Sequence, residues 1–223
     1  MITLVLEAAT YAGSVAVLDD GRLVVERSVT MRGREREALM PAVAEALDEY
    51  GVPADQLGRI VCGAGPGSFT SLRIAAAITK GLALASGAPL VPVSSLALLV
   101  ASQRVIAPGK YLAAIDALRG EHYVALYEVG IDGVIVPRGE PSLVATTSLG
   151  DEALHREARL VGGGMIPADA VEAVPHARGA AQLISLIDET PAADLAAWEP
   201  SYGRLAEAQV KWEAAHGRPL AAR

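Results

Sequence analysis

The sequence predicts an α/β protein made of two lobes, each with a mixed sheet and helices on its faces. The chain begins with three strand-like segments and then alternates helix and strand, and this order starts again after about residue 105. Its 223 residues, 52% of them hydrophobic, are enough for two lobes with a core each. We therefore expect a first lobe at residues 1–104 and a second at residues 105–223, although the two halves share negligible sequence identity.

The first lobe is expected to start with a strand at residues 2–9 and a hairpin at residues 14–29, whose turn contains Asp20-Gly21. Residues 34–51 have helical spacing and end in a glycine, a common helix stop. Pro41 lies inside this segment, so it either kinks the helix or belongs to its first turn. The apolar face of the helix is predicted to consist of Leu39, Val43, Ala46, Leu47 and Tyr50.

Residues 59–65 form a predicted buried strand that leads directly into a long helix at residues 68–86. On a helical wheel the bulky apolar side chains of this helix gather on one face, which we expect to pack on the sheet. This predicted core face consists of Ile74, Ile78, Leu82 and Ala85. Roughly opposite lie two cations among small or apolar residues, a face that allows another helix to approach closely or is simply exposed to solvent. It consists of Arg73, Ala76, Ala77, Lys80 and Leu84.

The uncharged stretch at residues 81–103 is long enough to cross a bilayer. Gly87, Pro89 and Pro92 interrupt it, however, and two serines follow. We therefore expect a helix end, a short buried strand at residues 88–93 and a new helix, with no membrane span.

The second lobe is expected to repeat the order of the first. A strand pair at residues 110–129 surrounds a turn near Leu118–Gly120, and a less regular extended segment follows. The remaining predicted elements are a helix at residues 147–158, a strand at 159–164, a helix at 177–189 and a tail with a short amphipathic helix after residue 198.

Composition narrows the class of protein. The net charge of −7 argues against a stand-alone nucleic-acid binder, which normally carries a basic face. The single cysteine, Cys62, cannot form an internal disulfide, and the first residues show no signal-peptide pattern. These features predict a cytoplasmic protein.

The Gly-rich turn between strand and helix at residues 63–68 has the layout that holds phosphate on backbone amides. A P-loop would need a lysine here, and a dinucleotide site would need an acidic residue about 20 positions on. The lysine is missing, and no Asp or Glu lies between Asp55 and Asp116. A GxSxG nucleophile motif is missing too, and the four histidines are too scattered for a metal pair.

What remains is a turn whose hydroxyls could accept hydrogen bonds from free amides at the start of the helix. We interpret it as a vestigial phosphate loop, consisting of Gly65, Pro66, Gly67, Ser68 and Thr70. The alternative is only a tight turn and a helix cap.

The segment GAGPGSFTSLRIAAAITKGLA resembles the signature of the TsaB (YeaZ) family, GPGSFTGLRIG followed by AKGLA. Residues 2–21, the helix REREALMPAVAEAL and the hairpin AAIDALRGEHYVALYE resemble the family in the same order, so the match covers most of the chain. The resemblance implies a two-lobed actin-like ATPase (ASKHA) fold with a degenerate second lobe.

The resemblance also implies the function. Such a protein is the non-catalytic dimerisation subunit of the machinery that forms N6-threonylcarbamoyladenosine at position 37 of tRNA. Its expected partners are the catalytic subunit TsaD and a TsaE-type ATPase, with a homodimer possible in their absence and tRNA reached only through the complex. No cofactor is expected in the isolated chain, although ATP or ADP could bind at the complex interface.

Two departures weaken any phosphate or metal site. The family commonly has Asp-Thr-Ser after the first strand, whereas this chain has Glu7-Ala8-Ala9. The histidine pair that holds the metal in TsaD is also missing, because residues 34–38 read REREA. Neither a metal site nor a catalytic residue is therefore carried over.

We expect the subunit interface on the two long helices of the first lobe. Its residues are Arg36, Met40, Ala44, Arg73, Ala76, Ala77, Lys80 and Leu84. Two rival functions stay open: a small-molecule kinase of the same fold, with Glu7 and Asp116 as candidate carboxylates, and a peptidase-like role, for which metal ligands are missing.

Overall fold

The structure is a computed structural model that describes residues 1–31 and 38–203. Its central strand in the first lobe is β1 (Ile2–Glu7), which pairs antiparallel with β2 (Ala12–Asp19), and β2 pairs with β3 (Arg22–Thr30). On its other side β1 is parallel to β4 (Arg59–Gly63), and β4 is parallel to β5 (Leu90–Val93). The strand order of this sheet is β3-β2-β1-β4-β5.

The second sheet has the same order of strands. Its central strand β6 (Gly109–Asp116) is antiparallel to β7 (Glu121–Val129) and parallel to β10 (Arg159–Gly162), which is parallel to β11 (Val171–Glu172). At the far edge β8 (Ile135–Pro137) and β9 (Ser142–Ala145) each pair with β7. The order β8-β7-β6-β10-β11 therefore repeats the first sheet, and it confirms the predicted two-lobed actin-like fold.

The second lobe has fewer helices between its strands than the first. In the first lobe the long helix α2 (Phe69–Ser86) connects β4 to β5, whereas residues 163–170, which connect β10 to β11, contain only bends and turns. The second lobe is therefore degenerate in the sense that it has no helix at the position of α2.

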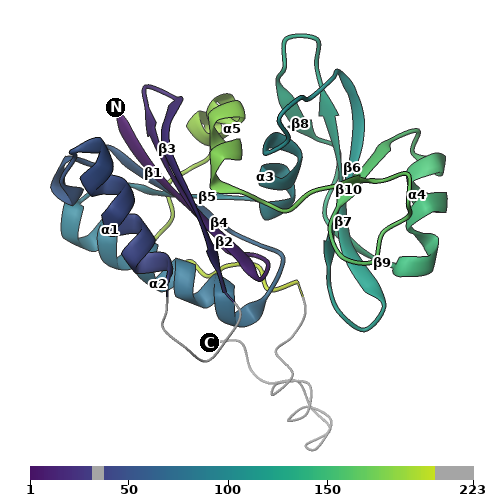
Figure 1. Ribbon diagram of the computed structural model, residues 1–223, viewed down its shortest axis with the longest axis horizontal. Helices are drawn as coiled ribbons and strands as arrows, with labels where there is room; N and C mark the ends of the chain where they lie inside the picture. Colours follow the sequence, from purple (N-terminus) through teal and green to yellow (C-terminus); the bar gives the residue numbers. More distant parts are fainter. Residues whose placement is uncertain (32–37, 204–223) are drawn as a thin grey trace, which may run out of the picture.

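Helices α1 (Leu39–Tyr50) and α2 cover one face of the first sheet (Figure 1). The predicted apolar face of α1 is confirmed for four of its residues, and Tyr50 is half-buried at the helix end. Pro41 lies in the first turn, where a proline needs no intrahelical hydrogen bond, and Gly51 ends the helix with a positive φ of 73°. A short 3₁₀ helix, η1 (Ala54–Gln56), follows.

The predicted core face of α2 is wrong. The side chains of α2 that are buried are Ser71, Leu72, Ala75, Ala76, Thr79 and Ala83. Ile74, Ile78 and Leu82 are only half-buried and pack on the flank of the cluster shared with α1, while Ala85 is exposed. The small residues let the helix lie close to β4 and β1, and Thr79 tolerates burial because its hydroxyl donates to the carbonyl of Ala75 at 2.8 Å.

A third layer of helices lies between the two sheets. It contains α3 (Ser95–Ala101), the 3₁₀ helix η3 (Ala177–Gln182) and α5 (Ile184–Glu189). The largest hydrophobic cluster joins this layer to one face of each sheet, so the two lobes share a core. On the outer face of the second sheet, a smaller cluster packs under α4 (Leu149–His155), which directly follows the 3₁₀ helix η2 (Thr146–Ser148).

The last described segment returns to the first lobe. η3 contacts α3 and β2, the guanidinium of Arg59 forms an ion pair with Asp188 at 2.5 Å, and the Ala193 N–H donates to the carbonyl of Leu90 at 2.7 Å. The strands do divide between the lobes near residue 104, but residues 177–199 pack with the first sheet. The division into 1–104 and 105–223 stays a prediction, and the predicted tail helix lies outside the described residues.

Leu90–Val93 and Ser95–Ala101 correspond to the strand and helix expected in the uncharged stretch. Among the helices of the described residues, none combines the length and the apolar character needed to cross a bilayer.

Candidate functional site: a pocket between the lobes

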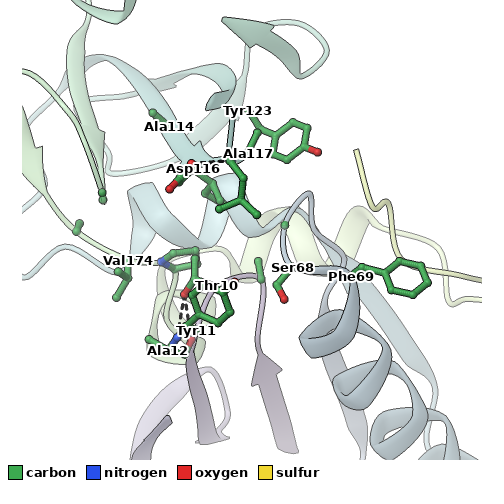
Figure 2. Close-up of a pocket in the computed structure, with 18 of the residues that line it drawn as sticks. Thr10, Tyr11, Ala12, Ser68, Phe69, Ala114, Asp116, Ala117, Tyr123 and Val174 are labelled. Carbon is green, nitrogen blue, oxygen red and sulfur yellow. Dashed lines mark hydrogen bonds between the residues drawn. The ribbon is translucent and has the colours of Figure 1, made fainter. Parts of the chain in front are cut away.

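A pocket of about 630 Å³ lies where the two sheets meet. Its walls come from the turn after β1, the start of α2, the end of β6 and the segments after β10 and β11. Figure 2 shows Asp116, Ala117 and Tyr123 on one side of the opening and Thr10, Tyr11 and Ala12 on the opposite side. The carboxyl ends of the parallel strands thus converge here, where α/β sheets usually bind ligands.

The structure brings part of the predicted phosphate loop to this pocket. Gly67, Ser68 and Thr70 line it, whereas Gly65 and Pro66 are buried behind the wall. The N–H of Gly65 donates to the hydroxyl of Ser95 at 3.0 Å. The turn is therefore anchored to α3 as well as to α2.

The turn packs directly against the residues that follow β1. A Cβ on Gly67 would overlap the backbone carbonyl and the methyl group of Ala9, and the Ser68 N–H donates to the Ala9 carbonyl at 2.7 Å. The amide of Ser68 is thus used inside the chain, and Ala9 presents a methyl group here and no hydroxyl. These contacts close the turn on the side where a phosphate would need amides and hydroxyls.

The expectation that Ser68 and Thr70 accept hydrogen bonds from helix amides is wrong for Ser68, because no side chain caps α2. The hydroxyl of Ser68 instead lies 3.1 Å from the hydroxyl of Ser71, one turn further on. Thr70 is exposed on the pocket rim.

Glu7, one of the two candidate carboxylates, is fully buried at the end of β1. Its carboxyl accepts hydrogen bonds from the Ala9 N–H at 2.5 Å and the Ser95 hydroxyl at 2.8 Å. Burial raises the pKa of Glu7 to about 7, and the hydrogen bonds from Ala9 and Ser95 oppose this rise. The side chain therefore ties β1 to α3 and does not face the pocket.

Asp116, the other candidate, lines the pocket at the end of β6. Its carboxylate accepts a hydrogen bond from the Leu118 N–H at 2.7 Å and so supports the turn to β7. Leu118 and Arg119 adopt φ values of 63° and 57°, a left-handed conformation that is unfavourable for residues with a side chain. Asp116 is exposed and could contact a ligand, while also stabilising this turn.

Within residues 1–31 and 38–203, no three His, Cys, Asp or Glu side chains lie together in a way that could hold a metal ion. Cys62 is fully buried in β4, and this burial raises the pKa of its thiol to about 12. The thiol is therefore unreactive.

The structure separates the predicted interface residues into exposed and buried ones. Arg73, Ala77, Met40 and Ala44 are exposed, Leu84 is 73% exposed, and Lys80 is half-buried. Ala76 is only 7% exposed, so it offers little surface to a partner. Arg36 lies outside the described residues. That the exposed residues bind a partner stays a prediction.

Sequence reasoning missed an aromatic group beside this face. The guanidinium of Arg73 lies 5.2 Å from the ring centre of Phe69, and the ammonium of Lys80 lies 5.7 Å from that of Trp198. Phe69 in turn lies 4.6 Å from Tyr202, centre to centre. Trp198 and Tyr202 were the available signal, in a chain with only 4% aromatic residues.

Comparison with known proteins agrees with this architecture. The chain is 31% identical to the tRNA threonylcarbamoyladenosine biosynthesis protein TsaB of Bacillus subtilis, over 95% of this chain and 98% of that protein. The chain belongs to the TsaB family. It is also 34% identical to the TsaB of Escherichia coli, over 60% of this chain and 58% of that protein.

The solved structure of YeaZ from Pseudomonas aeruginosa matches this TsaB-family chain with a TM-score of 0.73 and 28% identity, covering 90% of this chain and 99% of that one. The family model of TsaD, described as tRNA N6-adenosine threonylcarbamoyltransferase, matches residues 32–138. The TsaB-family fold is thus supported over nearly the whole chain. The match to TsaD runs from before α1 to just after β8, so it includes most of the first lobe and the first strands of the second.

Proposed function

We propose that this chain is a non-catalytic subunit in the biosynthesis of N6-threonylcarbamoyladenosine in tRNA, and that it binds and supports the catalytic subunit TsaD. The coarser part of this proposal, involvement in that biosynthesis, is supported by the match to TsaB along almost the full length of both chains. The similarity to TsaD fits a pair of related subunits that associate through corresponding surfaces.

The observation that carries the non-catalytic role is the closed phosphate turn. The Ala9 carbonyl accepts the Ser68 N–H, and Gly67 packs on Ala9. Glu7 is occupied by hydrogen bonds inside the lobe. A kinase of the actin-like fold needs free amides and carboxylates at this place to hold phosphates and Mg²⁺.

The partner-binding role is supported by the exposed face of α2. Arg73, Ala77 and Leu84 lie on this face, which combines a cation with small and apolar side chains. Such a face suits close packing with a helix of another protein. We place the TsaD contact here, together with Met40 and Ala44 of α1.

Further parts of the proposal concern the assembly. ATP or ADP binds at the complex interface and not in the isolated chain, a TsaE-type ATPase joins the complex, and tRNA is contacted through it. In the absence of TsaD the same face supports a homodimer. The reaction takes place in the cytoplasm.

Reconstitution with unmodified tRNA, a threonylcarbamoyl donor and purified subunits tests the proposal. The chain alone is expected to form no modified nucleoside and to hydrolyse no ATP at an enzymatic rate, with or without Mg²⁺. Addition of the chain to TsaD should raise product formation above that of TsaD alone. Product formed by the chain without TsaD would overturn the non-catalytic role, and unchanged activity of TsaD would overturn the supporting role.

A further inference from the structure

The last six described residues, 198–203, cross from the first lobe to the second, and we call them the strap. At one end Trp198 packs beside α2 under Lys80. In the middle the Ser201 N–H donates to the Ala64 carbonyl at 2.8 Å, which fixes the strap to the end of β4. At the other end Gly203 lies against the ring of Tyr123 on β7. The strap therefore touches both lobes.

Tyr202 forms the link between the lobes. Its ring lies 4.6 Å from the ring of Phe69, and its carbonyl accepts a hydrogen bond from the Tyr123 hydroxyl at 3.3 Å. Phe69 and Tyr123 both line the pocket, one from each lobe, and Figure 2 shows them on the same side of it. The strap thus connects two parts of the pocket lining that come from different lobes, the start of α2 and β7.

The strap is also connected to the exposed face of α2. Lys80 lies over Trp198, and Arg73 lies over Phe69, the ring that Tyr202 contacts. Such cation–ring contacts are weak at a protein surface and depend on the cation staying over the ring. A carboxylate of a bound protein that drew either cation away would loosen one end of the strap.

We propose that the strap couples the exposed face of α2 to the width of the interlobe pocket. With the strap in place the pocket is held at one width. Binding of a protein at Arg73 and Lys80 shifts the strap and, through Tyr202, the walls formed by Phe69 and Tyr123. The link to a bound protein rests on the proposed function, whereas control of the pocket by the strap does not.

Spin labels on the two walls measure the pocket width directly. Thr70 and Leu118 both line the pocket, come from different lobes and are exposed, so Thr70→Cys and Leu118→Cys provide labelling sites. The native Cys62 is fully buried and should stay unlabelled, which the unsubstituted chain checks. Pulsed electron–electron resonance then gives the distance distribution between the two walls.

In this background Tyr202→Ala is expected to raise the population of chains with a wider pocket about threefold to tenfold relative to the native width, because the aromatic contact between Tyr202 and Phe69 is lost. Tyr202→Phe is the matched control, since it keeps the ring and the backbone carbonyl, and it should leave the distribution unchanged. Gly203→Ala offers a second route: its Cβ would overlap the Tyr123 ring at a φ of 71°, so it should widen the distribution without removing a ring. The same distribution in all four chains would overturn the proposal.

Measurements with TsaD present distinguish the proposed function from the proposed coupling between the strap and the pocket. TsaD should change the distance distribution of the otherwise native double-labelled chain and have less effect when Trp198→Ala removes the ring under Lys80. If TsaD does not bind at all, the proposed function fails, while the effect of Tyr202→Ala without TsaD still decides the role of the strap. If TsaD binds and the distribution is unaffected, the coupling is wrong and the proposed function is untouched.

Discussion

The carboxyl of Glu7 sits at the end of β1 with no exposure to solvent, held by Ala9 and Ser95. Its pKa is raised from 4.5 to about 7, chiefly by burial. The folded chain therefore keeps a proton that the unfolded chain has already released at pH values between these two. Stability from this group is fully present below the unfolded pKa and is lost as pH rises through the folded one.

We predict that Glu7→Gln removes this pH dependence. A glutamine keeps an acceptor for the Ala9 N–H and is neutral at every pH, and its amide can donate to the Ser95 hydroxyl. Urea denaturation should show that the stability of the native chain, relative to the variant, falls by about 2–3 kcal/mol between about pH 5 and about pH 8. Parallel pH profiles for the two chains would contradict the prediction.

His176 should respond to pH in the opposite direction. Its Nδ1 accepts a hydrogen bond from the Arg178 N–H at 3.1 Å, which requires an unprotonated nitrogen, and its Nε2 lies 3.0 Å from the Ser28 hydroxyl. Burial lowers its pKa below 6.5, with the charge of Arg178 adding to this and that of Glu26 opposing it. The neutral ring thus stabilises the fold above pH 6.5, and this contribution is lost as pH falls below it.

We therefore predict that the native chain loses stability on acidification relative to His176→Asn, which can still accept at the start of η3 but does not titrate. Thermal melting at a series of pH values from about 8 down to about 5.5 measures the difference. A constant gap in melting temperature between the two chains over this range would show that His176 does not titrate in the way its contacts indicate.

Among the elements, α2 offers a matched pair of neighbouring alanines. Ala77 is exposed, whereas Ala76 is only 7% exposed. Ala77→Glu should leave the melting temperature nearly unchanged and weaken TsaD binding more than a hundredfold, since a few kcal/mol are lost at a packed contact. Ala76→Glu should instead lower the melting temperature sharply, because it buries an unpaired carboxylate.

Calorimetry of TsaD binding and thermal melting of each variant check this pair. Equal affinity for the native chain and Ala77→Glu would mean that the interface lies elsewhere. A large drop in the melting temperature of Ala77→Glu would mean that the face is part of the core.

The two faces of α2 also show what the sequence could and could not predict. Strand alternation and the Asp20-Gly21 turn predicted the first sheet, and the repeated order predicted the second. The helical wheel failed because it ranked faces by side-chain bulk, whereas α2 lies close to the sheet through small residues such as Ala75 and Ala83. The pocket was predicted only as far as the Gly-rich turn, since Asp116 and Tyr123 reach it through the packing of one lobe on the other.

At the scale of the whole molecule, the net charge predicts how strongly the chain binds RNA. With a net charge of −7 the isolated chain can neutralise few phosphates, so we predict weak binding to tRNA that depends little on salt. Fluorescence anisotropy with labelled tRNA, measured with and without TsaD, tests this. Tight and strongly salt-dependent binding by the chain alone would show a basic surface that the composition does not indicate.

The return of the last described residues to the first lobe has a consequence for synthesis. Leu195 and Trp198 pack on the cluster formed by β1, β4, α1 and α2, and Ala193 bonds to β5. A nascent chain emerges from its N-terminus, and lobes that are contiguous in sequence can fold in that order. Here the first sheet is translated well before residues 193–198, which pack beside it. Until those residues have been made, the edge of the first sheet at β5 and the apolar side chains beside α2 lack the cover that they have in the folded chain.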